Sequence, residues 1–341
     1  MRDSSAERRI RSSVSRWTGV RRRVNRLGTA SVKDSQGVDT AVDLGGIALR
    51  NPVLTASGTF GYGTEFAPFL DLRRLGGFVA KSLTLEPRIG NPPPRIAEAP
   101  SGMLNAISLE NVGVEAFIDE KLPAIPEGVT VIASVFETDI DGYAEVCKRL
   151  TGAPRIAGLE VNASCPHVKS GGIEFGQDPA VLGQLVRTVR RATTLPLLVK
   201  LSPNVTHIAE MARVCEAEGA SGISLINAVQ ALEVDPETRR PLLSNGLGGL
   251  SGPAIRPIAL RMVWQASQAV SIPISGGGGI ENAADAVKFL LCGATAVQVG
   301  TSNYLQPSIA GDVADGIVEY ATRHGYQRIR DLVGALEFPG R

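Results

Sequence analysis

From residue 40 onward the chain repeats one short pattern eight times, and this repeat constrains the fold more than any other feature. Each unit is a run of β-branched and other apolar residues that ends in small or polar residues and is followed by a helical pattern. The runs are continuously apolar, as expected for strands that are covered on both faces. They are NPVLTAS (51–57), GFVAKSLT (77–84), VTVIASV (129–135), GLEVNAS (158–164), LPLLVKLS (195–202), GISLINA (222–228), IPISGGG (272–278) and AVQVGTS (296–302).

Helical patterns lie between these runs and carry recognisable boundary residues. Eight βα units in 341 residues predict an α/β fold, a (β/α)8 TIM barrel with extended loops at the C-terminal face of the strands. An open, doubly wound sheet is the alternative. The clearest helical patterns are 178–193, 206–219, 252–269 and 281–293, with Asp178 and Thr206 as expected N-caps and Gly219 and Gly293 at expected helix ends.

Two connections are longer than a plain barrel needs. Residues 85–113 follow the second predicted strand and residues 229–251 follow the sixth, and both are rich in Gly, Pro and Arg. Long ordered loops are usually functional. Because both follow the C-terminal ends of strands, where barrels build their active sites, we expect them to contribute to a site.

Composition and charge divide the chain into a tail and one domain. The balance of 43% hydrophobic and 20% charged residues is typical of a globular protein, and no stretch approaches the roughly 20 apolar residues of a membrane helix. Residues 1–33 hold nine arginines and one lysine against two acidic residues. We expect 1–38 to be a basic, disordered extension and 39–341 the catalytic domain, in a cytoplasmic protein. An arm that binds nucleic acid or acidic lipid is the alternative for the tail.

The four cysteines are widely separated and include no C-x-x-C pair, which argues against disulfides and against a zinc or iron–sulfur site. Cys147, Cys215 and Cys292 lie in helix-like apolar patterns, where a free cysteine acts as a small hydrophobe. Cys165 differs, because it follows a strand end in the stretch VNASCPHVKSGG. Its position favours chemistry over packing.

The predicted strand ends form a polar ring. Lys81, Asn162, Lys200 and Asn227 fall at the same level of the barrel, and a buried lysine needs a polar or charged partner. Only three histidines occur in the chain, so a histidine-based triad or metal cluster is improbable and no metal site is predicted.

The last two strand ends are rich in glycine. PISGGGGIENA allows backbone N–H groups to approach a ligand, VGTSNY adds a glycine and a hydroxyl, and together they predict a phosphate site after strands seven and eight. A phosphate-bearing cofactor beside lysines and a thiol suggests flavin mononucleotide (FMN), because a nearby cation stabilises the reduced ring. Pyridoxal phosphate, or a Schiff base of Lys200 in an aldolase, would use similar parts but would leave Cys165 unexplained.

Several motifs together resemble one family over residues 40–335. They are NPVLTASGTFGYGTEF, KSLTLEPRIGNPPPR, GMLNAISLEN, NASCPHVKSGG, FGQDP, VKLSPNVT, LINA, GGLSGPAIRPIAL and VGTSNY. In order and spacing they resemble the class 1 dihydroorotate dehydrogenases, and within them the class 1B catalytic subunit. The resemblance implies an FMN-binding barrel in pyrimidine biosynthesis that oxidises dihydroorotate to orotate, with Cys165 as the base that removes the C5 proton while hydride passes from C6 to the flavin.

The resemblance also implies the binding residues, position by position. Those expected to contact substrate are Lys81, Asn105, Ala106, Ile107, Ser108, Leu109, Asn162, Asn227 and Ala228. Those expected to hold FMN are Ser57, Gly58, Lys81, Ser82, Ser134, Asn162, Lys200, Ile226, Gly252, Gly278, Gly279, Gly300 and Thr301.

Four positions depart from the family pattern: Ser108 stands in place of Gly, Ser134 and His167 in place of Asn, and Ala228 in place of Thr or Ser. Ser134 and the CPH triplet resemble instead the pyrimidine-reducing domain of dihydropyrimidine dehydrogenases, so uracil or thymine reduction is an alternative activity. A barrel that serves only as a scaffold is the non-enzymatic alternative. The class 1B resemblance further implies an electron-transfer subunit with FAD and a [2Fe–2S] cluster, on a homodimeric core or in a heterotetramer.

Overall fold

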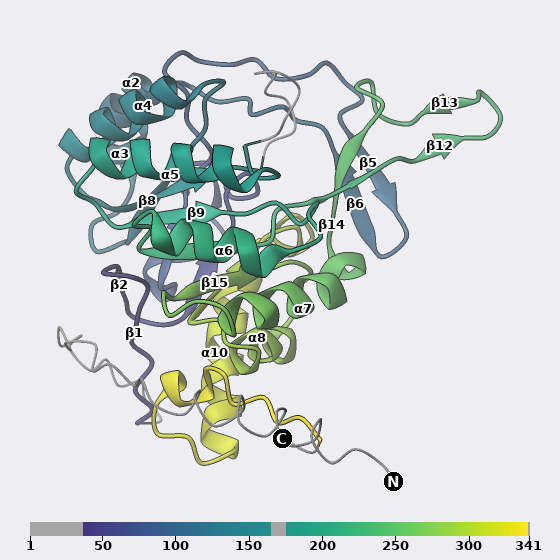
Figure 1. The fold of residues 1–341 in the computed structure, drawn as a ribbon. Helices are drawn as coiled ribbons and strands as arrows, with labels where there is room; N and C mark the ends of the chain where they lie inside the picture. Colours follow the sequence, from purple (N-terminus) through teal and green to yellow (C-terminus); the bar gives the residue numbers. More distant parts are fainter. Residues whose placement is uncertain (1–36, 165–174, 340–341) are drawn as a thin grey trace, which may run out of the picture. The chain divides into compact units, whose positions relative to one another are not determined.

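The computed structural model describes residues 37–164 and 175–339, so most of the predicted tail and Cys165 lie outside the described residues. Eight parallel strands close into a barrel in the order β10-β15-β16-β3-β4-β7-β8-β9 (Figure 1). The barrel prediction is therefore confirmed, and each strand lies within or overlaps a predicted run. The bounds are β3 Val53–Thr55, β4 Gly77–Val79, β7 Val131–Val135, β8 Ile156–Asn162, β9 Leu197–Lys200, β10 Gly222–Leu225, β15 Ile274–Gly277 and β16 Ala296–Val299.

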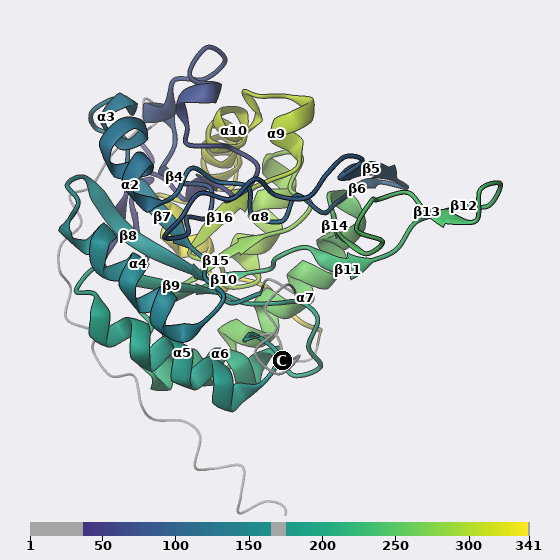
Figure 2. The same ribbon diagram turned by 90° about the horizontal axis from the view of Figure 1, so that it is seen from above.

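Helices follow most of the barrel strands and surround them (Figure 2). The connection from β3 to β4 is an exception, because its described segment contains only two short 3-10 turns. The helical elements are η1 Thr64–Phe66, η2 Leu72–Arg74, α2 Val114–Ala116, the π-helical η3 Phe117–Lys121, α3 Leu122–Ala124, α4 Ile140–Gly152, α5 Pro179–Ala192, α6 Ile208–Ala217, η4 Pro253–Ile255, α7 Arg256–Ser267, α8 Ala283–Leu291, α9 Ser302–Leu305, α10 Ile309–Arg323 and η5 Ile329–Leu332.

The helix boundaries test two N-cap predictions. Asp178 caps α5 as predicted, since its side chain accepts hydrogen bonds from the backbone N–H groups of Ala180 and Val181. Thr206 was the wrong choice for α6, whose N-cap is His207 without a side-chain cap bond. No helix in the described ranges is long and apolar enough to cross a membrane.

An antiparallel hairpin, β1 (Val42–Asp43) and β2 (Ala48–Leu49), closes the N-terminal end of the barrel. Leu44 and Ile47 from this hairpin are buried and belong to one apolar cluster with Leu54, Ile132 and Leu198 from the barrel strands. These side chains fill the bottom of the barrel. The open end is therefore the C-terminal one.

The two long connections form a second sheet beyond the C-terminal ends of the strands. It has the antiparallel order β11-β14-β6-β5, in which β14 from the second connection pairs with β6 from the first. A two-stranded hairpin, β12 with β13, extends from it (Figure 1). The bounds are β5 Ile96–Ala99, β6 Gly102–Asn105, β11 Val229–Ala231, β12 Val234–Asp235, β13 Arg240–Pro241 and β14 Gly248–Ser251. Loops 144 residues apart in the chain thus become neighbours, with Asn105 opposite Gly249.

Three cysteines pack as predicted. Cys147 on α4 and Cys215 on α6 are fully buried in the main apolar core, and Cys292 lies just after α8 at the edge of that core. Burial raises the pKa of the Cys147 thiol to about 12 and that of Cys215 further still. All three therefore act as small apolar side chains.

Candidate active site

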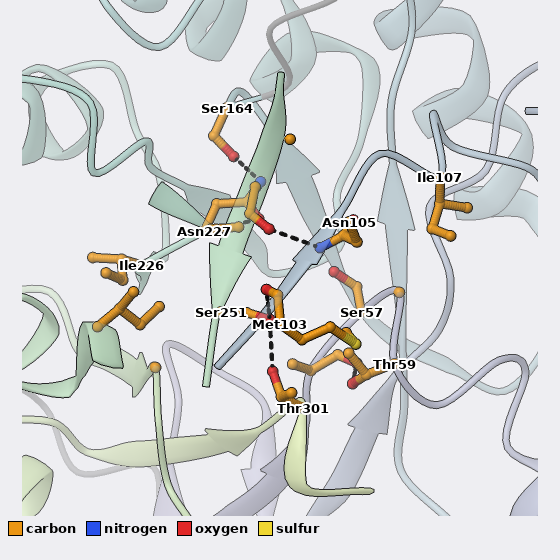
Figure 3. A pocket seen from close by; sticks show the side chains of 18 of the residues that line it. Ser57, Thr59, Met103, Asn105, Ile107, Ser164, Ile226, Asn227, Ser251 and Thr301 are labelled. Carbon is orange, nitrogen blue, oxygen red and sulfur yellow. Dashed lines mark hydrogen bonds between the residues drawn. The ribbon is translucent and has the colours of Figure 1, made fainter. Parts of the chain in front are cut away.

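One cavity of about 430 Å³ opens at the C-terminal end of the barrel, between the strand ends and the second sheet. Its volume lies within the usual range for a small-molecule or cofactor site. Figure 3 shows side chains from β6, from the loop after β3 and from the segments after β8, β10 and β16 directed at the same space. The walls thus come from segments widely separated in the chain.

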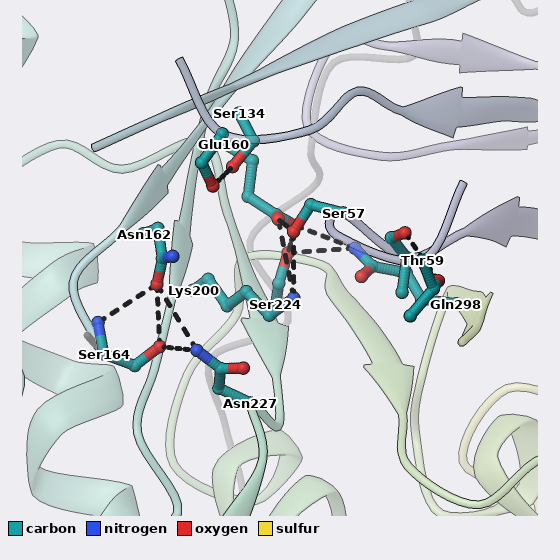
Figure 4. Close-up of polar contacts among 12 residues, drawn as sticks. Ser57, Thr59, Ser134, Glu160, Asn162, Ser164, Lys200, Ser224, Asn227 and Gln298 are labelled. Carbon is teal, nitrogen blue, oxygen red and sulfur yellow. Dashed lines mark hydrogen bonds and ion pairs between the residues drawn. The ribbon is translucent and has the colours of Figure 1, made fainter. Parts of the chain in front are cut away.

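A charged cluster forms the floor of this cavity. The Lys200 ammonium, at the end of β9, donates a hydrogen bond to Ser57 Oγ at 3.2 Å and lies 3.8 Å from Glu160 Oε1 (Figure 4). Lys200 has 7% of its side chain exposed and Glu160 none, so the two opposite charges are held together away from bulk water. This arrangement fixes a cation at the base of the site.

An amide and hydroxyl network occupies one wall (Figure 4). Asn162 Oδ1, at the end of β8, accepts hydrogen bonds from Ser164 Oγ at 2.9 Å and from Asn227 Nδ2 at 3.4 Å. Asn227 Nδ2 also donates to Ser164 Oγ at 2.5 Å. Tyr143 on α4 donates to the Asn162 carbonyl oxygen at 2.8 Å and so anchors the strand end. The network pre-orients both amides for a polar ligand.

The loop after β6 covers another side of the cavity. Asn105, at the end of β6, donates through Nδ2 to the Gly249 carbonyl oxygen of β14 at 3.3 Å. Ser108 and Leu109 have φ of 62° and 59°, the left-handed region that favours glycine. The glycine that the family pattern has at position 108 would adopt this backbone without strain.

A cradle of glycine backbone forms another part of the cavity lining. Gly278 and Gly279, directly after β15, have φ of 128° and 76°. A Cβ at Gly279 would come within 2.7 Å of the Gly252 carbonyl oxygen, so only glycine fits this close approach. Thr301, after β16, donates to Ser251 Oγ at 2.8 Å beside it. Backbone N–H groups exposed in such turns suit an anion.

Lys81 and Ser82 complete the ring at the end of β4. Burial lowers the pKa of the Lys81 ammonium, while the charge of Glu110 acts in the opposite direction. Ser82 Oγ lies 2.8 Å from Ser134 Oγ of β7, and this contact places Ser134 behind the wall. A second lysine therefore faces the cavity from β4, three strands away from β9 in the barrel order.

The structure brings nearly all of the predicted site residues together. The predicted residues that line the cavity are Ser57, Gly58, Lys81, Ser82, Asn105, Ala106, Ile107, Ser108, Leu109, Asn162, Lys200, Ile226, Asn227, Ala228, Gly252, Gly278, Gly279, Gly300 and Thr301. Ser134 is fully buried and is not part of the cavity lining, and its Oγ contacts Oγ of Ser82, which lines the cavity. The predicted base, Cys165, lies outside the described residues, one position after Ser164 of the amide network.

Among the polar side chains that sequence reasoning missed are Glu160 and Gln298 in the barrel interior. Gln298 of β16 lines the cavity, and Glu160 of β8 lies beneath it with no exposed surface. A glutamate in the middle of the apolar run GLEVNAS was a usable signal, because a charged residue is rarely fully buried without partners.

Comparisons with known proteins agree with this geometry. The family model described as "Dihydroorotate dehydrogenase" matches residues 40–320. A protein of Pelobacter propionicus is 55% identical over 300 residues, covering 88% of this chain and 99% of its own length. Proteins of Geotalea daltonii and Geobacter sulfurreducens are 53% and 50% identical and cover 88% and 89% of this chain and 98% and 99% of their own lengths. All three are named "Dihydroorotate dehydrogenase B (NAD(+)), catalytic subunit". The chain therefore belongs to the dihydroorotate dehydrogenase family, and within it is most similar to B-type catalytic subunits.

Proposed function

We propose that this chain is the catalytic subunit of an FMN-dependent dihydroorotate dehydrogenase that oxidises dihydroorotate to orotate in pyrimidine biosynthesis. One observation carries the proposal. Lys81, Asn105, Asn162 and Asn227, from four different segments, line one cavity together with Lys200 and the glycine cradle. The names of the similar proteins support the same substrate.

The donor set fits FMN. The Gly278–Gly279 backbone, with Thr301 beside it, forms a cradle for a phosphate that a side chain would block. Lys200 supplies a cation at the floor, where it would favour an electron-rich ring. FMN, when bound, supplies the hydride acceptor for the oxidation. The remaining chemistry belongs to side chains of this protein.

The substrate is a ring with amide groups and a carboxylate. Lys81 would pair with the carboxylate, and its partial burial strengthens that attraction. Asn162 and Asn227 are already oriented by hydrogen bonds to Ser164 and to each other, so little conformational freedom is lost when they bind the ring amides. The loop Asn105–Leu109 would cover the substrate and exclude water.

Cys165 is the proposed base that removes a proton from C5 of dihydroorotate. A thiol becomes a competent base near neutral pH when cations or N–H donors stabilise its thiolate. The proposal for Cys165 rests on the sequence, in which it follows the network residues Asn162 and Ser164 directly. Proton removal would leave an electron pair at C5, and this pair would form the C5–C6 double bond as hydride leaves the neighbouring C6.

Electrons must leave the flavin, and we propose an electron-transfer subunit for this step. The similar proteins are named as catalytic subunits and with NAD(+), which supports a separate partner that passes electrons to NAD. That partner would carry FAD and a [2Fe–2S] cluster. A homodimeric core or a heterotetramer would then be the working assembly.

An anaerobic absorbance titration of the purified chain tests the proposal. Dihydroorotate and dihydrouracil are added separately while the flavin band is followed. Bleaching by dihydroorotate alone is the expected result. Bleaching by dihydrouracil alone would assign the chain to pyrimidine reduction, the activity suggested by Ser134 and the CPH triplet. A preparation that cannot be loaded with FMN would overturn the flavoenzyme proposal. The remaining hypotheses would then be an aldolase that uses Lys200 or a scaffold role.

A further inference from the structure

Glu160 is a charged side chain that the proposed reaction does not use. It lies on β8, two residues before the end of the strand, and has no exposed surface. It is not among the residues that line the cavity, so it cannot contact a ligand there directly. Burial of an ionised carboxylate destabilises the fold unless hydrogen-bond and charge partners compensate for the lost hydration.

Each oxygen of Glu160 accepts hydrogen bonds inside the barrel (Figure 4). Oε2 accepts from Ser224 Oγ of β10 at 2.6 Å and from Gln298 Nε2 of β16 at 2.8 Å, and Oε1 accepts from Ser57 Oγ at 3.3 Å. All three partners are donors, the environment that an ionised carboxylate needs because it can only accept. Three different strands or strand ends therefore hold this group in one position.

Glu160 is also coupled to the cation at the cavity floor. Its Oε1 lies 3.8 Å from Lys200 Nζ, and Ser57 links the two by accepting from the lysine at 3.2 Å and donating to the carboxylate. Among the described residues no other ion pair of Lys200 is found within 4 Å. Whatever Lys200 does toward a ligand is therefore set partly by Glu160.

We propose that Glu160 is a positioning residue that holds Lys200 in place and that its negative charge, which offsets the charge of Lys200, lowers the reduction potential of the flavin. This inference rests on the proposed FMN site. Lys200 alone would present a full positive charge to the ring, and the carboxylate behind it offsets that charge. Because a flavin gains negative charge on reduction, the offset lowers its tendency to be reduced. Such a balance would let the flavin accept hydride and still release its electrons to an external acceptor.

The test is the midpoint potential of bound FMN in Glu160→Gln, measured by spectroelectrochemical titration against the wild-type holoenzyme. Glutamine keeps the shape of the side chain, its amide oxygen can accept from Ser224 and Gln298, and its NH₂ can donate to Ser57. At a fixed potential the ratio of reduced to oxidised FMN should rise at least tenfold. This corresponds to a rise of about 30 mV in the midpoint potential of a two-electron couple. Sulfite, which forms an electron-rich adduct with oxidised flavin, should bind more tightly by a similar factor.

Ser224→Ala is the matched control, because it removes the 2.6 Å hydrogen bond to the same carboxylate and leaves the charge in place. A merely structural role for Glu160 predicts equal losses of thermal stability in both variants and no shift of potential in either. The inference predicts a shift in Glu160→Gln alone. A potential that is unchanged or lower in Glu160→Gln overturns it.

Two further proteins keep the test decisive if Glu160→Gln does not fold. Lys200→Met leaves the carboxylate as an uncompensated charge, and Lys200→Met with Glu160→Gln removes both charges. FMN in the double variant should have the higher potential of the two, and equal potentials would contradict the inference. If the wild-type protein binds FMN but the variants show no such differences in potential, only this inference fails. Wild-type protein that binds no FMN would defeat the proposed function with it.

Discussion

The two ends of the barrel are built from the same strands but have opposite interiors. At the N-terminal end the inward residues Leu54, Ile132 and Leu198 pack with the β1–β2 hairpin in a buried apolar cluster. Toward the C-terminal end, Lys200 lies one inward position after Leu198 on β9, and with Glu160 of the neighbouring β8 it forms a buried polar floor. The comparison teaches that close packing at one end supports the strands, so that the other end can hold charges that would not stabilise a fold on their own.

The largest expected effect falls on the polar end. Cys165→Ser should retain FMN but slow flavin reduction by dihydroorotate by about 10²-fold or more, because serine is a far weaker base than a thiolate. Stopped-flow absorbance under anaerobic conditions measures the rate. Cys292→Ser, a cysteine beside α8 and outside the cavity, is the control and should reduce at the wild-type rate. Equal rates for the two variants would remove Cys165 from the mechanism.

The apolar end should respond in stability and not in chemistry. Leu198→Ala removes a fully buried side chain from the barrel interior and should lower the free energy of unfolding by about 2–5 kcal/mol. Urea denaturation measures this change. Leu305→Ala, at a side chain that is 82% exposed, should change stability by no more than about 0.5 kcal/mol. If Leu198→Ala instead changed flavin reduction at unchanged stability, the division between the two ends would be wrong.

A smaller effect is expected in the loop above the polar end. Ser108→Gly should relieve the strain of a left-handed backbone conformation, which stabilises the folded state by about 1 kcal/mol. Glycine also gives the unfolded chain more conformational freedom, which opposes this gain, so the net change in the free energy of unfolding should stay within about 0.5 kcal/mol. Ser101→Gly has a similar φ of 54° outside the cavity lining and provides the comparison. The KM for dihydroorotate should change in Ser108→Gly alone. An equal change in both variants would mean that the loop does not sense the substrate.

The smallest effect should be at the buried thiols of the outer helices. Burial raises the pKa of Cys147 to about 12, so its reactive thiolate is scarce at pH 8 and the thiol is also shielded from reagent. Iodoacetamide at pH 8 should leave Cys147 and Cys215 unmodified in the folded protein and modify them in urea, as peptide mass spectrometry can record. Modification of either thiol without unfolding would show that these helices open locally.

Much of the fold and site followed from local patterns. The apolar runs predicted all eight barrel strands because strands covered on both faces must be continuously apolar. The polar strand ends predicted the ring of Lys81, Asn162, Lys200 and Asn227, since the C-terminal ends of parallel strands meet on one face. The N-cap of α6 was misjudged by one residue, because the backbone turn before a helix decides which residue becomes the cap.

The pairing of distant segments could not be predicted in this way. The loops 85–113 and 229–251 were expected near a site, but their union in one antiparallel sheet depends on the barrel bringing both strand ends together. The role of Glu160 was missed for the same reason, because its partners Ser57, Ser224 and Gln298 come from parts of the chain 64 to 138 residues away.

By itself the sequence determined the repeating βα order, the apolar and polar ends of each strand, and the residue types available for binding and proton transfer. These are properties of short segments, set by side-chain period and backbone preference. Only the tertiary structure decided which of those residues share a cavity, and that a buried carboxylate lies 3.8 Å from the lysine at its floor. Barrel closure is a long-range event, and charges from separate strands interact strongly only after it has excluded water from between them.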